Sequence, residues 1–239
     1  MKIGWSVLFF VPWLSGCSGG NDYSESNMKL FAALYDFEPL KGEVREAHFS
    51  IRDETGESFQ EIVIKLDPHG CLTSMDVEGT PVGAVSLKRE GNRIAGTEDN
   101  KKVTFETDKN CIILNKKMDN GELVSSFSYD KNNTVVSVIN GKPHKSYRYR
   151  YHPDGKEMVI DVIVSDAIVD KTKISYSDPV NKYLDYSARS DGPLLGESVT
   201  EMSCKYKNKT PERCDITYKF LDEGTTATLH MDIRATFYE

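Results

Sequence analysis

The segment that decides the fold is FQEIVIKL, residues 59–66, in which apolar and polar side chains largely alternate. Successive side chains of a β-strand point to opposite faces, so the pattern puts four of them mostly on one face: Phe59, Ile62, Ile64 and Leu66. Similar alternation, bounded by turn residues, recurs along most of the chain. It predicts a mainly β fold with little helix, an antiparallel meander of hairpins that forms a curved sheet or an open, barrel-like structure.

Turn signals support the hairpins. Asn120-Gly121, Asn140-Gly141 and Asp154-Gly155 each suit a type I′ turn, whose two central residues both need positive φ. Twelve Tyr and ten Phe also favour strands, because aromatic side chains pack well on a pleated surface. Only residues 28–34 suggest otherwise, as one short helical turn or an irregular lead-in to the sheet.

The charge of the chain limits its partners. Its 239 residues carry a formal net charge of −7, from 30 Lys and Arg against 37 Asp and Glu. A nucleic-acid partner needs a basic face that displaces counterions from phosphates, so we expect no nucleic-acid binding. An anionic membrane surface would not attract this acidic body, and attachment to a membrane therefore requires a lipid.

The N-terminus carries such an attachment signal. After Lys2, residues 3–14 are almost uniformly apolar, a run shorter than the roughly 20 residues needed to span a bilayer. Residues 1–16 thus predict a cleaved signal peptide. The sequence LSGC at residues 14–17 resembles the lipobox of bacterial lipoproteins, which implies cleavage before Cys17 and its conversion to an N-palmitoyl, S-diacylglycerol cysteine. The alternative is an ordinary secretory signal followed by a chance cysteine.

The lipobox sets the expected organisation and location. We expect residues 17–34 to be the lipidated N-terminus and a tether, and residues 35–239 to be one β-rich domain. Two or three acyl chains hold a protein durably on a membrane, whereas one gives only marginal binding. The body would face the periplasm from a membrane of the cell envelope, and Ser18, where an aspartate commonly retains lipoproteins in the inner membrane, favours the outer membrane.

Four cysteines remain after Cys17, an even number that predicts two disulfides in an exported protein. Three pairings are possible, and we favour Cys204–Cys214 and Cys71–Cys111. Cys204 and Cys214 flank a polar turn between strand-like segments, so a hairpin would bring them together. Metal or redox roles are disfavoured, because no Cys-x-x-Cys motif occurs and no histidine lies at ligand spacing from a cysteine.

The segment YRYRY, residues 147–151, places three tyrosines on one face of a strand and two arginines on the other. It has two interpretations. The tyrosines could form an aromatic platform for a sugar or a single-stranded nucleic acid. The favoured interpretation is a half-buried strand whose rings cover the core, because tyrosine is a preferred strand residue and the chain is acidic.

No catalytic motif stands out, so we predict a protein that is not an enzyme and holds no metal or cofactor. The chain lacks a Gly-x-Ser-x-Gly elbow and any zinc or EF-hand spacing. The glycosylation sequons at Asn132 and Asn208 are interpreted as turns. The histidines are scattered along the sequence: His48, His69, His144, His152 and His230.

Along essentially its whole length, the chain resembles the YnfC-like family of small Gram-negative lipoproteins. That resemblance implies a modified Cys17 and no assigned activity or catalytic residues. The residues that carry it are Cys17 in its lipobox, the segment YDFEPLKG at 35–42, Gly70-Cys71, Asp178-Pro179, Leu184-Asp185-Tyr186, Cys204-Lys205-Tyr206, Cys214 and Asp222-Glu223-Gly224.

The functional hypothesis is a binding or scaffold protein of the envelope, anchored by lipid, with an envelope protein or glycan as partner. The alternative is an envelope hydrolase with an unrecognised site. A deep pocket that gathers carboxylates or histidines would favour the hydrolase. An exposed apolar patch or a free sheet edge would favour partner binding.

Overall fold

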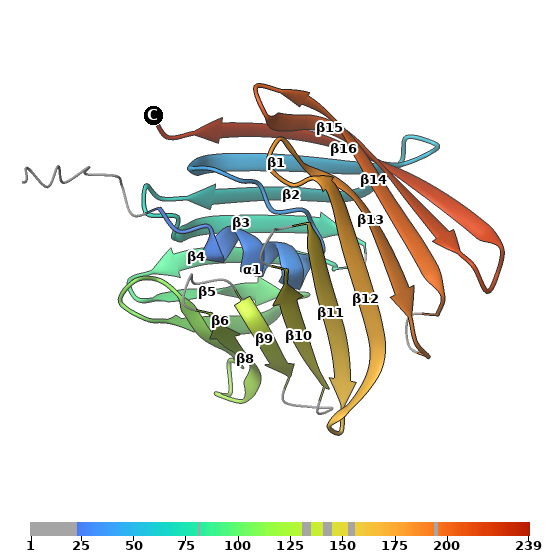
Figure 1. Ribbon diagram of the computed structural model, residues 1–239. Coiled ribbons are helices and arrows are strands. Elements are labelled where there is room, and N and C mark those ends of the chain that lie inside the picture. Colours follow the sequence, from blue (N-terminus) through green and yellow to red (C-terminus); the bar gives the residue numbers. More distant parts are fainter. Residues whose placement is uncertain (1–22, 81, 131–134, 141–144, 153–155, 194–195) are drawn as a thin grey trace, which may run out of the picture.

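A computed structural model describes residues 23–80, 82–130, 135–140, 145–152, 156–193 and 196–239 (Figure 1). The signal peptide, Cys17 and His144 lie outside these residues, as do the sequon at Asn132 and all or part of the turns expected at Asn140-Gly141 and Asp154-Gly155. The described part of the chain contains sixteen strands and one helix. The elements are α1 (Ser26–Tyr35), β1 (Val44–Asp53), β2 (Ser58–Leu66), β3 (Leu72–Gly79), β4 (Val85–Glu90), β5 (Arg93–Glu98), β6 (Lys101–Thr107), β7 (Ile113–Met118), β8 (Leu123–Tyr129), β9 (Val135–Asn140), β10 (Lys145–Tyr151), β11 (Glu157–Val164), β12 (Ala167–Asp178), β13 (Lys182–Asp191), β14 (Ser198–Lys207), β15 (Thr210–Phe220) and β16 (Thr225–Phe237).

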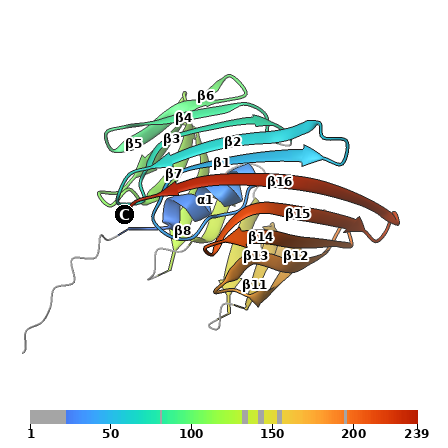
Figure 2. The same cartoon turned by 90° about the horizontal axis from the view of Figure 1, so that it is seen from above.

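The strands form a closed antiparallel barrel. Each strand pairs with its neighbours in the chain, and β1 pairs with β16 to close the ring. The predicted mainly β, antiparallel meander is therefore confirmed. In Figure 1, strands β1–β5 run in a different direction from β10–β12, and α1 lies between the two groups. Seen from above, the strands surround α1 (Figure 2).

The inner face of the barrel is apolar. In β2, Ile62, Ile64 and Leu66 are at most 2% exposed, as the alternation predicted. Phe59 does not share this face, because strict alternation places Gln60 there instead. Gln60 is 1% exposed and its side-chain amide donates a hydrogen bond to the carbonyl oxygen of Tyr35, at 3.0 Å.

The hairpin turns differ in part from the expected ones. A turn does join β7 to β8 at Asn120-Gly121, but only Gly121 has positive φ, so the turn is not of type I′. Two successive residues with positive φ, the backbone signature of type I′, occur instead at Asp99-Asn100, Ser165-Asp166 and Asn208-Lys209. Asp and Asn are the residues besides glycine that enter this region most readily.

Helix α1 fills the centre of the barrel. Met28, Leu30 and Phe31 are at most 1% exposed, and the Phe31 ring meets the Phe105 ring of β6 edge-on with centroids 5.6 Å apart. Residues 23–34 thus belong to the folded body, although the sequence analysis assigned them to the tether. The folded body begins earlier than the expected boundary at residue 35.

The end of α1 is tied to the barrel wall by buried polar groups. The Tyr35 hydroxyl donates a hydrogen bond to the carboxylate of Glu98 on β5. The Lys116 ammonium of β7 lies 2.6 Å from the same carboxylate, and both side chains are mostly buried. This paired arrangement satisfies an ionic group inside an otherwise apolar interior.

The start of α1 is held at the β2–β3 turn. The amide N–H of Ser24 donates to the His69 carbonyl at 3.0 Å, and the Asn27 side chain donates to the Gly70 carbonyl at 3.0 Å. A Cβ atom added to Gly70 would lie 2.1 Å from the carbonyl oxygen of Ser24. Gly70 is therefore required for the close approach of these two segments.

Both disulfides join the pairs favoured from the sequence. Cys71–Cys111 links the turn that receives α1 to the turn before β7. Cys204–Cys214 joins directly opposed residues of β14 and β15. In the loop-entropy model, closures of 40 and 10 residues stabilise the fold by about 4 and about 3 kcal/mol.

The packing of α1 generates a stability prediction. Phe31→Ala should lower the free energy of unfolding by about 3–5 kcal/mol, because it removes a fully buried ring and leaves a cavity. Chemical denaturation of the purified protein measures this change. Phe220→Ala, which truncates a ring that is 40% exposed, is the matched control and should cost far less. Equal losses for the two variants would contradict the role given to α1.

Candidate functional site

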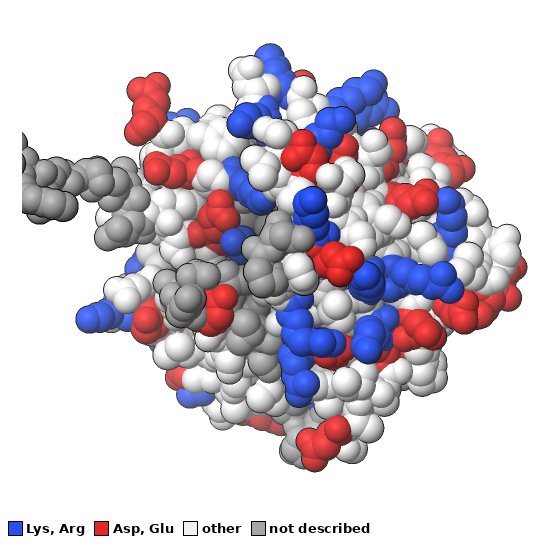
Figure 3. Space-filling view, viewed as in Figure 1, with Lys and Arg blue, Asp and Glu red and all other residues white. Residues whose placement is uncertain are grey.

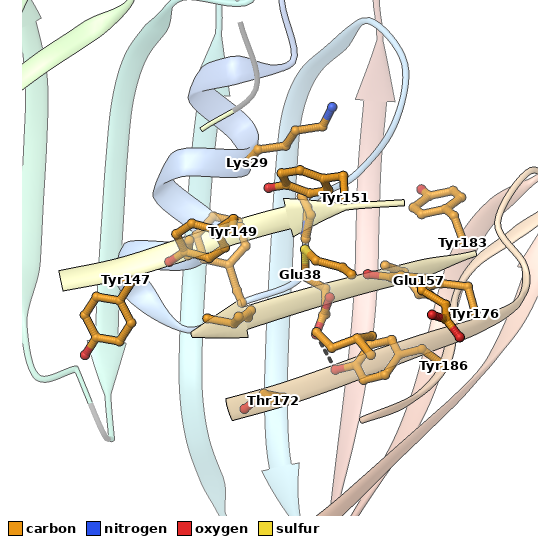
Figure 4. A pocket seen from close by; sticks show the side chains of 18 of the residues that line it. Lys29, Glu38, Tyr147, Tyr149, Tyr151, Glu157, Thr172, Tyr176, Tyr183 and Tyr186 are labelled. Atoms are coloured by element: carbon orange, nitrogen blue, oxygen red, sulfur yellow. Dashed lines mark hydrogen bonds between the residues drawn. The ribbon is translucent and has the colours of Figure 1, made fainter. Parts of the chain in front are cut away.

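A cavity of about 730 Å³ lies inside the barrel (Figure 4). It separates the inner segment, which consists of α1 and residues 36–41, from the wall formed by β10–β13. One side is built from α1 and residues 36–41, and the other from the inward side chains of those strands. Its volume falls within the usual range for small-molecule sites, about 300–1,000 Å³. The tyrosines among its lining residues are Tyr147, Tyr149, Tyr151, Tyr176, Tyr183 and Tyr186.

The YRYRY segment forms β10 and supplies half of these rings. Its three tyrosines face the cavity beside three aliphatic side chains of β11, with which they pair in register: Met158, Ile160 and Val162. Arg150 points to the outer face and makes an ion pair with Asp161 at 2.8 Å. The rings face inward, as the favoured interpretation expected, but they line a cavity instead of covering a filled core.

Two carboxylates of residues 36–41 line the side of the cavity that faces β10–β13. Asp36 follows α1 in the left-handed conformation, with φ at 55°. Its side chain lines the cavity, and burial raises its pKa. Glu38, two residues on, accepts a hydrogen bond from the Tyr186 hydroxyl at 2.7 Å. Burial, with a smaller contribution from the charge of Asp36, raises the pKa of Glu38 to about 7.

Aromatic side chains surround Glu38. The rings of Tyr176 and Tyr186 meet edge-on with centroids 5.9 Å apart, on adjacent positions of β12 and β13. Burial followed by the charge of Glu38 raises the pKa of both phenols, and burial with the nearby carboxylates raises that of Tyr218 to about 12. The phenols are therefore neutral hydrogen-bond donors at physiological pH.

The lysines that line the cavity contact groups other than Asp36 and Glu38. Lys29 pairs with Glu25 at 3.0 Å, one helical turn away. Lys41 donates to the Pro179 carbonyl at 2.6 Å and lies 5.0 Å from the centroid of the Tyr183 ring. Lys145 lies 5.1 Å from the centroid of the Tyr147 ring. The cavity thus combines rings and aliphatic side chains with carboxylates. Asp36 and Glu38 lie on the side of α1 and residues 36–41, and Asp130, Glu157 and Asp170 belong to the strand side.

The residues singled out from the sequence do not converge on this site. Cys17 lies outside the described residues, and the four other cysteines form the disulfides. His48 and His230 make ion pairs with Glu46 and Asp215 on the outer face, and His69 lies in an exposed turn.

The sequence analysis missed the carboxylates on the inner segment of the cavity. Asp36 and Glu38 belong to the segment at 35–42 that carries the family resemblance, yet nothing assigned them a role. The available signal was the alternation of acidic with apolar residues in that segment, which lacks a strand partner. Tyr186 belongs to the segment at 184–186 that also carries the resemblance, but it was given no role. Tyr176 gave no signal, because tyrosine is common in strands.

The outer face of the barrel is polar. In the view of Figure 3, basic and acidic side chains are interspersed across the surface. Cross-strand ion pairs such as Lys65–Glu46 and Lys219–Glu201 occur on this face. No helix within the described residues is both long and apolar enough to cross a membrane.

The raised pKa of Glu38 generates a pH prediction. The folded state favours the protonated carboxyl, so the contribution of Glu38 to stability is fully present below its ordinary pKa of 4.5 and is lost as pH rises through about 7. Glu38→Gln, which mimics the protonated form, should match the wild type near about pH 5 and exceed its melting temperature near about pH 8.

Thermal unfolding followed by circular dichroism across this pH range provides the measurement. Glu61→Gln, on the exposed outer face, is the control and should leave the pH dependence of the wild type unchanged. If Glu38→Gln followed the wild-type pH profile throughout, the assigned pKa of Glu38 would be refuted.

Among solved structures, the chain is similar to a porin-like protein from Bacteroides uniformis, with a TM-score of 0.57 and 10% sequence identity. The match covers 81% of this chain and 96% of that protein. At this identity the likeness concerns the fold alone, and the two outer surfaces are not implied to be alike.

Sequence comparisons give closer relatives. The chain is 28% identical over 208 residues to the UPF0257 lipoprotein YnfC of Escherichia coli O81 (strain ED1a), and 27% identical to that of strain K12 / DH10B. Each match covers 82% of this chain and 80% of the relative. The model of an uncharacterised protein family, UPF0257, matches residues 1–234. The chain therefore belongs to the UPF0257 family.

Proposed function

We propose that this protein is a lipid-anchored lipoprotein of the bacterial envelope whose barrel binds a small amphipathic molecule in its central cavity. The observation that carries the proposal is the cavity of about 730 Å³ with its lining of six tyrosines. Ligand sites combine a largely apolar lining with a few polar groups that orient the ligand, and this cavity has both.

Sequence features support the anchor. The lipobox at residues 14–17 directly follows an apolar run, and the relatives from Escherichia coli are named lipoproteins. Each buried methylene of an acyl chain contributes about 0.8 kcal/mol, so two or three chains on Cys17 hold the protein durably. The polar outer face suits a body in the aqueous periplasm, and Ser18 favours attachment to the outer membrane.

The cavity lining supports an amphipathic ligand. Tyr149 and Ile160 lie opposite each other and present apolar surface, and Thr172 adds a hydroxyl on the next strand. Tyrosine suits such sites because it offers a large ring and a hydroxyl with few rotatable bonds. The binding role is therefore assigned to a small molecule held inside the barrel.

A hydrolase is the second candidate, because Glu38 has a pKa of about 7 and lies beside Asp36 in the cavity. General acids are commonly carboxyls with raised pKa values. The binding role is preferred because the rings and aliphatic side chains give binding surface, whereas catalysis needs a second group aligned on a substrate. The two differ in outcome: a bound ligand is recovered unchanged, whereas a substrate is converted unless Glu38→Gln prevents it.

A probe and a space-filling substitution test the cavity. 4-Phenylbutanol, a water-soluble amphipathic molecule, should bind saturably and with one-to-one stoichiometry to the protein in lipid nanodiscs. Titration calorimetry, with protein-free nanodiscs subtracted, measures the binding. Ala33→Trp should weaken it, because Ala33 lines the cavity and the indole would occupy part of the space.

Ala167→Trp, at the exposed β11–β12 turn, is the matched control and should leave binding intact. Absence of saturable binding to the wild type, or equal binding to the Ala33→Trp variant, would count against the cavity as the site.

The anchor has its own test. Cys17→Ala should release the protein from membranes and abolish labelling by a fatty-acid probe, because the thiol that accepts the lipid is gone. Fractionation of envelopes and gel fluorescence provide the two measurements. Membrane retention at the wild-type level would refute the anchor.

A further inference from the structure

We propose that the cavity selects an organic cation, an amphipathic ammonium compound whose charged group binds beside Asp36 and Glu38 among the rings of Tyr176 and Tyr186. This inference rests on the proposed function and adds the chemical class of the ligand. It follows from three features of the described residues: the acidic pair, the rings around it, and the engagement of the neighbouring lysines.

The acidic pair has no cationic partner among the described residues. Asp36 takes part in none of the ion pairs found there, and Glu38 interacts through the Tyr186 hydroxyl. Elsewhere in the interior a carboxylate is neutralised, as Glu98 is by Lys116. Glu38 is partly buried and Asp36 is more exposed. Desolvation disfavours the charged form of both carboxyls, so a cation from outside the chain would stabilise their charged forms.

The rings supply the second feature. Tyr176 and Tyr186 lie edge-on to each other beside Glu38, and Tyr218 is close enough for the charges of Asp36 and Glu38 to raise its pKa. Ring faces attract cations, most strongly where water is excluded, and aromatic cages recognise quaternary ammonium groups in this way. A hydrated metal ion would gain nothing from these rings, whereas an alkylammonium would contact them directly.

The lysines supply the third feature. Lys41, on the same segment as Glu38, is held by the Pro179 carbonyl and the Tyr183 ring. The charges that influence the pKa of Lys41 come from Glu25 and Lys29, not from Asp36 or Glu38. Lys29 in turn pairs with Glu25. The acidic pair therefore remains open to an added cation.

The rest of the lining fits the tail of such a molecule. Ile160, Val162 and Ile174 extend the apolar surface along β11 and β12 from Tyr176. A cationic head beside Glu38 would leave its apolar part against these side chains. A neutral sugar would use the phenol groups but not the charges, and an anion would be repelled by the pair.

Three probes with the same phenyl-alkyl skeleton and different head groups test the inference. They are 4-phenylbutyltrimethylammonium, 4-phenylbutanol and 4-phenylbutanoate, which carry a positive, neutral and negative head. Titration calorimetry uses the full-length protein in lipid nanodiscs, with protein-free nanodiscs subtracted. The cation should bind about tenfold more tightly than the alcohol, and the anion more weakly than both.

Matched variants separate local from long-range charge. Asp36→Asn/Glu38→Gln should reduce the preference for the cation to within about twofold while binding of the alcohol persists, which shows that the cavity is intact. Asn tolerates the left-handed conformation of residue 36. Asp76→Asn/Glu61→Gln removes the same charge from the outer face and should retain the full preference.

A pH series adds a further readout. Affinity for the cation should rise as Glu38 loses its proton around pH 7, in the field of Asp36, Tyr176, Tyr186 and Tyr218, while affinity for the alcohol stays constant. Equal binding of all three probes, a preference for the anion, or a preference for the cation that survives Asp36→Asn/Glu38→Gln would each overturn the inference and leave the proposed cavity standing. Failure of every probe to bind the wild type would overturn both.

Discussion

The rest of this structure depends on the width of the sixteen-stranded barrel. Eight strands close into a barrel that strand side chains alone can fill, whereas sixteen enclose far more volume. Here the buried side chains of β1–β3 and β6 that face inward are mostly apolar, so this part of the interior must be packed by protein. Helix α1 and the segment that follows it do this, with Phe31 packed against Phe105 and Phe37 against Phe49.

The filling is uneven, and this unevenness creates the site. Helix α1 packs closely on the wall that includes β3 and β6, and there the Glu98 carboxylate that accepts from Tyr35 is paired with Lys116. Towards β10–β13 the same segment turns Asp36 and Glu38 into open space faced by tyrosines. The packed contacts and the proposed binding site thus lie on opposite sides of one segment.

The sequence predicted the antiparallel strands and the Cys204–Cys214 pair, because these depend on local alternation or on a nearby turn. Cys71–Cys111, which spans 40 residues, followed only as the remaining pair. Closure was not predictable, since it depends on β1 meeting β16, which no local pattern reports. Phe59 was placed on the inner face because it is apolar, although strict alternation from Ile62 puts Gln60 there. The cavity was missed because alternation shows on which face of the sheet the Tyr149 side chain lies. It does not show whether the space in front of that side chain is filled.

The pairing of β1 with β16 has a consequence for assembly. Val44 and Phe237, partners in that ladder, lie at opposite ends of the domain sequence, so the β1–β16 ladder cannot form until the whole domain sequence is available to fold. Ladders between sequence neighbours can form earlier, but they leave two unpaired strand edges that are prone to associate with other chains. Contacts of such long sequence separation also slow folding. Until β1 and β16 pair, these two edges stay open to other chains.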